Sequence, residues 1–245
     1  MDNLILTKES DGVFSITLNR LSKKNALNTQ MYLELCELFN YASETDSIHC
    51  VLIQGDQSCF CAGNDLQDFI DSAASGDLAA LDFVKVLSIF KKPLIAAVAG
   101  AAVGIGTTLL LHCDMVIAAN NGKFKLPFTQ LGLCPEAGSS YLLPSRIGHN
   151  KAFELLVLGK MFNSEEALQL GIINQICQPE ELLGIAADIA ATIAHLPFDA
   201  VMTSKRLMRQ ASNNILPDVI ADEGEEFSRL VNTDECKNIL AKFFQ

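Results

Sequence analysis

The sequence predicts an α/β core followed by a helical C-terminal region. Two observations support this fold class: short apolar strands alternate with helical segments up to about residue 150, and strand patterns nearly vanish after it, where helical segments are separated by Pro, Gly or Asn. Strands that alternate with helices are typical of a largely parallel sheet. We therefore expect an α/β core over residues 1–160 and a helical region over residues 161–245, with residues 161–171 as the hinge.

The first predicted elements are a hairpin and a helix. Residues 12–19 alternate between apolar and polar side chains, which is the period of a half-buried strand. Asp11-Gly12 before them is a two-residue turn signal that predicts pairing with residues 4–7. From Asn28 the apolar period becomes helical, and Asn28 or Thr29 can cap that helix.

Three continuously apolar segments predict strands that are covered on both faces: residues 50–55, 94–100 and 115–119. Between the last two, residues 101–113 read as a glycine-containing turn that runs into an apolar helix. Further helices are predicted over residues 164–170, 180–195, 198–212, 217–230 and 234–244.

Composition excludes several classes of protein. Hydrophobic residues make up 49% and charged residues 19% of the 245 positions, which suits a large buried core. The net charge of −11 argues against nucleic-acid binding but leaves a phosphorylated small ligand open. No apolar stretch approaches the roughly 20 residues that cross a bilayer, so we expect no membrane partner. Neither end carries a recognisable targeting signal, and we expect a cytoplasmic protein.

The eight cysteines are scattered through apolar stretches, where a reduced cysteine packs as a small hydrophobic residue. Cys59 and Cys61 stand two apart, but no further His or Cys completes a set of ligands. We expect no metal site.

Three segments could carry chemistry. Residues 60–66 form a short turn of small residues after a strand, where backbone N–H groups can face a ligand. Residues 100–111 form a Gly-rich turn before a helix, which suits an oxyanion better than a nucleotide phosphate because no phosphate-loop motif is present. An ordinary tight turn and close helix–sheet packing are the alternative readings of these two segments.

The third segment, residues 131–144, contains Glu136 among Leu, Cys, Ala and Gly. Few groups there can solvate a carboxylate, so its pKa should rise toward that of a useful base. The alternative is a carboxylate that only complements the N-terminus of a helix. The four histidines have no nucleophile motif beside them, and His112 reads as a packed helical residue.

In combination, these segments resemble the crotonase (enoyl-CoA hydratase/isomerase) superfamily. The resemblance runs from about residue 4 to residue 242 and rests on LNRLSKKNALN, FCAGNDL, KKPLIAAVAGAAVGIG, HCDMVIAANNGKF, PEAGSS and SEEALQLGIINQI. It implies a core of repeated β-β-α units. AGNDL and LPFTQLGLCPEAGSSYLLP are most similar to the peroxisomal-type Δ3,Δ2-enoyl-CoA isomerases. They are also similar to chromodomain-Y-like proteins, in which a related fold serves as a binding module.

The resemblance implies an oxyanion hole made of two backbone N–H groups, those of Asn64 and Ile105. Such donors hold a thioester oxygen as it becomes an enolate. The two glutamates of the hydratases fall at Thr108 and Phe128 in this sequence, so neither carboxylate is present. The isomerase base falls at Glu136.

These positions imply an isomerase that moves the double bond of a 3-enoyl-CoA to the trans-2 position in fatty-acid oxidation. A non-catalytic binding module and an enoyl-CoA hydratase remain the alternatives. The resemblance implies that coenzyme A is part of the substrate, that no other cofactor is needed, and that the protein forms homotrimers or dimers of trimers. It also implies contacts with the acyl-CoA from eight residues: Lys23, Lys24, Ala62, Gly63, Asp65, Leu66, Gly104 and Phe128.

Overall fold

The computed structural model describes residues 3–75 and 79–242. Within these residues the strands form two sheets, one of six strands in the order β1-β2-β3-β5-β7-β10 and one of four in the order β4-β6-β8-β9. The strands of the first sheet are β1 (Ile5–Ser10), β2 (Val13–Leu18), β3 (Cys50–Gln54), β5 (Leu94–Val98), β7 (Met115–Ala119) and β10 (Gln175–Cys177). Those of the second are β4 (Cys59–Cys61), β6 (Ala101–Val103), β8 (Lys123–Lys125) and β9 (Phe162–Asn163).

The larger sheet is parallel except at its first strand. β1 and β2 form the predicted hairpin, and their pairing runs antiparallel from Ile5↔Leu18 to Ser10↔Val13. Asp11 (φ 50°) and Gly12 (φ 78°) both take the left-handed conformation that a two-residue hairpin turn requires. The other four pairings in this sheet are parallel, which confirms the predicted α/β class.

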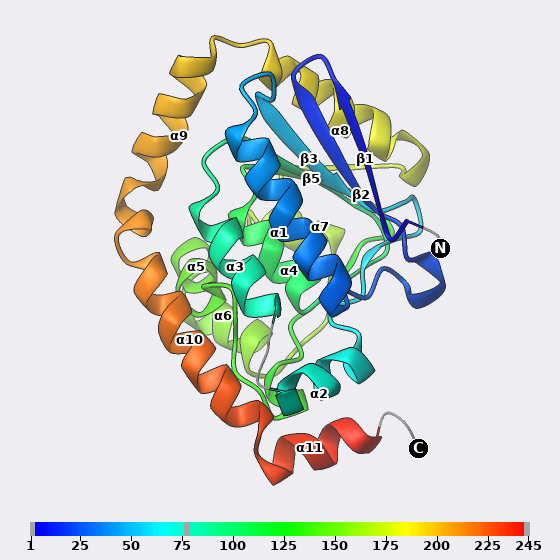
Figure 1. Ribbon diagram of the computed structural model, residues 1–245, viewed down its shortest axis with the longest axis vertical. Helices are drawn as coiled ribbons and strands as arrows, with labels where there is room; N and C mark the ends of the chain where they lie inside the picture. Colours follow the sequence, from blue (N-terminus) through cyan, green and yellow to red (C-terminus); the bar gives the residue numbers. More distant parts are fainter. Residues whose placement is uncertain (1–2, 76–78, 243–245) are drawn as a thin grey trace.

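Helices cover both faces of the larger sheet (Figure 1). Helices α1 (Thr29–Glu44) and α3 (Ala79–Ile89) share one apolar core with it, and α8 (Pro179–Ala194) packs on the opposite face. The side chain of Asn28 accepts the N–H of Met31, so Asn28 is the cap of α1. The remaining helices of the first part of the chain are α2 (Leu66–Ser75), α4 (Ile105–Thr108), α5 (Ser139–Ile147), α6 (His149–Leu156) and α7 (Ser164–Gln169).

The predicted helical C-terminal region is present. Helices α9 (Phe198–Asn213) and α10 (Leu216–Val231) follow one another along one side of the molecule, and α11 (Asp234–Ala241) crosses its lower end in the view of Figure 1. Helix α10 packs on α3 and α5, and α11 packs on α2. The last two residues of the helix predicted over residues 234–244 lie outside the described residues, because the structure does not describe residues 243–245.

Two parts of the sequence-based picture differ from the structure. The apolar helix expected after the Gly-rich turn is only the one-turn α4, followed by a 3-10 helix over Leu109–His112, since Cys113 is already extended. Strands β9 and β10 lie in the segment expected to be helical, and they pair with β8 and β7 of the core. The domain division at residue 160 and the hinge at residues 161–171 stay predictions.

Among the described residues no single helix is long and apolar enough to cross a membrane; α8 and α9 pass that test only as a pair, bent by 104°.

Candidate active site

The two glycine-containing turns lie side by side because they follow neighbouring parallel strands. β4 ends at Cys61 and β6 ends at Val103, and these two strands pair in parallel. The carboxyl ends of adjacent parallel strands lie at the same edge of a sheet, which is where ligands bind in open α/β folds. Asn64 and Ile105, predicted as partners, both line one cavity of about 320 Å³ at this edge.

The first turn is extended at Asn64. Leu27 forms a parallel bridge with it: the N–H of Leu27 donates to the carbonyl oxygen of Gly63 (2.8 Å), and the N–H of Asp65 donates to that of Leu27 (2.8 Å). Successive backbone groups in an extended segment point to opposite sides. The N–H of Asn64 therefore points away from Leu27 and is free of that bridge.

The second turn needs glycine at two positions. Gly104 has φ 54° and ψ −120°, a conformation that only glycine adopts readily. Its carbonyl oxygen accepts the N–H groups of Thr107 and Thr108, so the N–H of Ile105 comes before the first intrahelical bonds. A Cβ at Gly106 would lie 2.5 Å from the carbonyl oxygen of Cys61, so the two turns meet backbone to backbone.

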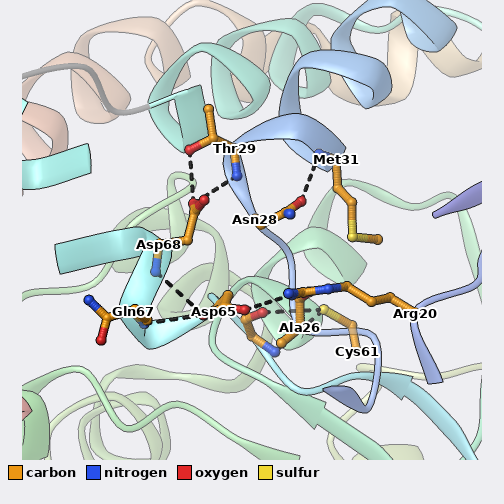
Figure 2. A network of polar contacts seen from close by, with 10 residues as sticks. Arg20, Ala26, Asn28, Thr29, Met31, Cys61, Asp65, Gln67 and Asp68 are labelled. Carbon is orange, nitrogen blue, oxygen red and sulfur yellow. Dashed lines mark hydrogen bonds and ion pairs between the residues drawn. The ribbon is translucent and has the colours of Figure 1, made fainter. Parts of the chain in front are cut away.

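A polar network holds the loop before α1 against the first turn (Figure 2). Arg20 pairs with Asp65 (2.7 Å) and donates to the carbonyl oxygen of Ala26 (2.9 Å). The carboxylate of Asp68 accepts both the N–H (2.7 Å) and the hydroxyl (2.8 Å) of Thr29. These bonds tie both ends of the loop to the start of α2, whose first residues directly follow Asn64.

Asn64 has a second support, which the sequence did not reveal. The phenol of Tyr32, buried on α1, donates to the side-chain oxygen of Asn64. Burial, with the nearby charges of Cys61, Glu136 and Asp68 adding to it, holds the pKa of Tyr32 well above its ordinary value. The phenol is thus a permanent hydrogen-bond donor close to the predicted base.

Glu136 is buried beside the second turn. Its side chain is 7% exposed, and its carboxylate accepts a hydrogen bond of 2.5 Å from the hydroxyl of Thr108, three residues after Ile105 on α4. Helix α5 begins at Ser139 with Gly138 as its cap, so Glu136 lies outside that helix rather than within its first turn.

Burial raises the pKa of Glu136 to about 8. The hydroxyl of Thr108 opposes this rise by stabilising the charged form, and the charge of Glu223 on α10 adds to it. A carboxyl group with a pKa near the working pH can both take and return a proton. The electrostatics therefore suit general acid–base chemistry.

Glu136 lines a second cavity of about 270 Å³, between α3 and α10, that also touches Glu223. Phe227 lines the first cavity and stands one helical turn after Glu223, so both cavities lie along the same face of α10. Thr108 joins the two parts of the site, because its helix begins at Ile105 and its hydroxyl contacts Glu136.

The other predicted contact residues divide into two groups. The first group lines the 320 Å³ cavity and contains Ala62, Gly63, Leu66, Gly104 and Phe128. The second group does not line it. Asp65 caps α2 and pairs with Arg20, while Lys23 and Lys24 are exposed on the neighbouring loop. A role for these three residues in binding coenzyme A stays a prediction.

Sequence reasoning missed several residues of the site. Phe69, Lys125, Gln130, Phe227 and Leu240 also line the cavity. They come from five separate elements or loops, and no local pattern marks them. His112, interpreted as a packed residue, is indeed buried, but its ring also contacts the carbonyl oxygen of Ala137, next to Glu136 (2.7 Å). Within the described residues, no group of three or more His, Cys, Asp or Glu is placed to hold a metal ion.

Comparison with known proteins identifies the family of this chain. The profile of the family described as Enoyl-CoA hydratase/isomerase matches residues 8–245. The chain belongs to this family. Human Enoyl-CoA delta isomerase 2 is 35% identical to it over 99% of this chain, which spans only 63% of the human protein. The 1,2-epoxyphenylacetyl-CoA isomerase of Escherichia coli K12 is 34% identical over 94% of this chain and 90% of its own.

Among solved structures, OdaA of Pseudomonas aeruginosa superposes with a TM-score of 0.96, at 42% identity and with both chains fully covered. The resemblance to the crotonase superfamily and its enoyl-CoA isomerases is therefore confirmed. Relatives named as hydratases match at 32% and 33% identity. Family membership thus leaves the reaction to be argued from the site.

Proposed function

We propose that this member of the enoyl-CoA hydratase/isomerase family is a Δ3,Δ2-enoyl-CoA isomerase that produces trans-2-enoyl-CoA in fatty-acid oxidation. One observation carries the proposal. Glu136 is a buried carboxyl group with a pKa of about 8, and it is hydrogen-bonded to the same short helix that begins with Ile105. A base is thereby set close to a predicted oxyanion donor.

The reaction follows from these two features. The thioester oxygen of a 3-enoyl-CoA accepts the N–H groups of Asn64 and Ile105. Glu136 removes a proton from C2, and the negative charge spreads over the dienolate and onto that oxygen. The protonated Glu136 then returns a proton to C4, so the double bond moves from C3=C4 to C2=C3. One base serves both carbons because they lie on one face of a planar dienolate.

The residues at the two hydratase positions favour this reaction over water addition. At the first position, where a hydratase has a carboxylate that holds a water molecule, this chain has Thr108, whose hydroxyl donates to Glu136. At the second position, Phe128 is apolar and 5% exposed. Two further carboxylates line the second cavity: the two oxygens of Glu223 accept the N–H groups of Gly138 and Ser140, and Glu225 is exposed on α10. Among the described residues that line this cavity, Glu136 is therefore the buried carboxyl group that is left available as a base.

The loop at residues 20–26 is proposed to meet the nucleotide end of coenzyme A. The carbonyl oxygen of Lys24 accepts the N–H of Ala62 (3.0 Å), so the loop lies directly beside the first turn. The exposed ammonium groups of Lys23 and Lys24 suit phosphate. We further propose that no cofactor beyond the coenzyme A of the substrate is needed, and that the protein works in the cytoplasm as a trimer or a dimer of trimers.

The test is incubation of the purified protein with trans-3-enoyl-CoA, with the 2-enoyl and 3-hydroxyacyl products measured separately. Formation of trans-2-enoyl-CoA as the main product supports the proposal. A predominance of 3-hydroxyacyl-CoA would make the protein a hydratase, and tight binding without turnover would make it a binding module.

A further inference from the structure

The turn that carries Glu136 has a backbone that its surroundings must hold in place. Ala137 (φ 59°) and Gly138 (φ 69°) are both left-handed, and this conformation costs free energy for alanine. Such residues persist where several contacts determine the local backbone. A Cβ at Gly138 would lie 2.3 Å from the side chain of Leu216, so the start of α10 presses directly on the turn.

Two buried side chains from distant parts of the chain form hydrogen bonds to the backbone of this turn. The carboxylate of Glu223, on α10, accepts the N–H of Gly138 (2.6 Å) with one oxygen and the N–H of Ser140 (2.9 Å) with the other. Nε2 of His112 also donates to the carbonyl oxygen of Ala137 (2.7 Å). Nε2 carries the hydrogen because a carbonyl oxygen can only accept. Burial lowers the pKa of His112 to about 3, so this ring stays neutral.

We propose that Glu223 is a positioning residue for Glu136: it clamps the turn that follows the base and so sets where the carboxyl group of Glu136 meets the substrate. The inference rests on the proposed function. Glu223 is 8% exposed and makes two bonds to consecutive parts of one turn, which loop packing alone does not require. Through it the C-terminal helix α10 acts on the base without touching the reacting atoms.

Glu223 also acts on Glu136 through its charge. Burial raises the pKa of Glu223, and the bonds from Ser140 and Gly138 oppose that rise by favouring the ionised form. Its negative charge in turn raises the pKa of Glu136. The other titratable groups that lie near Glu136 or line its cavity are Tyr32 on α1, Cys61 on β4, Lys85 on α3 and Glu225 on α10. A neutral side chain at position 223 therefore lowers the pKa of Glu136.

The decisive variant is Glu223→Gln, which keeps the shape but loses the charge and one acceptor oxygen. We expect kcat for 3-enoyl-CoA to fall roughly 10- to 100-fold, as for other small misplacements of a catalytic group, with KM nearly unchanged. We also expect the acid limb of the kcat–pH profile to move to lower pH. Asp222→Asn is the matched control, because it removes the same charge from an exposed neighbouring position on α10 and should leave both quantities unchanged.

A second measurement separates this inference from the proposed function. NMR titration of ¹³C-labelled glutamate carboxyl groups, with the Glu136 signal assigned by its loss in Glu136→Gln, reads the pKa of Glu136 without any turnover. The inference expects this pKa to fall in Glu223→Gln even if the wild-type protein proves inactive on 3-enoyl-CoA. A folded Glu223→Gln protein with unchanged kcat, or with an unchanged Glu136 titration, would overturn it.

If Glu223→Gln fails to fold, Glu223→Asp takes its place. It keeps the charge but is shorter by one methylene and cannot reach both N–H groups. A lower kcat, with the acid limb of the kcat–pH profile unchanged, then supports the positioning role. A kcat equal to that of the wild type contradicts it.

Discussion

Replacement of Thr108 by valine tests whether the environment of Glu136 sets the pH at which the enzyme works. The hydroxyl of Thr108 donates to the carboxylate of Glu136 at 2.5 Å and lowers its pKa, while burial raises that pKa to about 8. Valine has nearly the same shape as threonine but no donor. The variant therefore removes the interaction that favours the charged base and leaves the burial in place.

The magnitude follows from the bond that is lost. A hydrogen bond to a charged group contributes about 1.5–3 kcal/mol, and about 1.4 kcal/mol corresponds to one pKa unit. We expect the pKa of Glu136 to rise by roughly one to two units. Glu136 must be deprotonated to act as the base, so kcat/KM at pH 7 should fall about 10- to 100-fold and recover toward the wild-type value at high pH.

The assay is kcat/KM for 3-enoyl-CoA across the pH range in which the protein stays folded. In the wild type, this quantity should rise with pH through an apparent pKa of about 8. Thr108→Ser keeps the hydroxyl and should leave the limb in place. Superimposable profiles for the wild type and Thr108→Val would refute the reasoning, because Thr108 would then have no influence on the group that titrates.

Three further predictions concern the base and the two backbone donors. Ile105→Pro deletes one oxyanion N–H at the first position of α4, where proline is tolerated. It should lower kcat by roughly 10²–10³-fold while the circular dichroism spectrum stays unchanged. A folded and fully active variant would show that Ile105 is not part of the oxyanion hole. Asn64→Ala keeps its backbone N–H and loses only the bond from Tyr32, so kcat should fall much less than in Ile105→Pro; equal losses would mean that the side chain of Asn64 matters as much as the N–H. Glu136→Gln should raise the thermal midpoint at pH 9 but barely at pH 5. Because its pKa is raised, Glu136 contributes stability below its ordinary pKa of 4.5 and loses it as the pH rises through about 8, a difference of at most about 5 kcal/mol. A pH-independent difference between the two proteins would contradict this titration.

The parts of the site that the sequence could predict are those encoded locally. Asn64 and Ile105 both stand in short turns that are rich in small residues, and the family resemblance assigns both to the oxyanion hole. Glu136 stands in an apolar segment, so its raised pKa was expected from its immediate neighbours. These features depend on residues only a few positions apart.

Features that depend on distant contacts were not predictable. The strands of the second sheet have two or three residues each, too few to show a period, and only their pairing defines them. Glu223 is one of several acidic residues on α10, beside Asp222, Glu225 and Glu226, and nothing in that helix distinguishes it. Its role is visible only once α10 packs against the turn that follows Glu136. At Thr108 the sequence shows only that the hydratase carboxylate is absent, whereas in the structure the hydroxyl of Thr108 donates a hydrogen bond to Glu136.

The central claim is that Glu136 alone moves a proton from C2 to C4 of a 3-enoyl-CoA. The most direct measurement compares the wild type with Glu136→Gln on trans-3-enoyl-CoA in the presence of a metal chelator, with the affinity of each protein for the unreacted thioester measured in parallel. The account predicts trans-2-enoyl-CoA from the wild type, a loss of turnover by roughly 10²–10⁴-fold in the variant, and similar affinity for both proteins. Wild-type turnover in Glu136→Gln, or activity that the chelator abolishes, would contradict it.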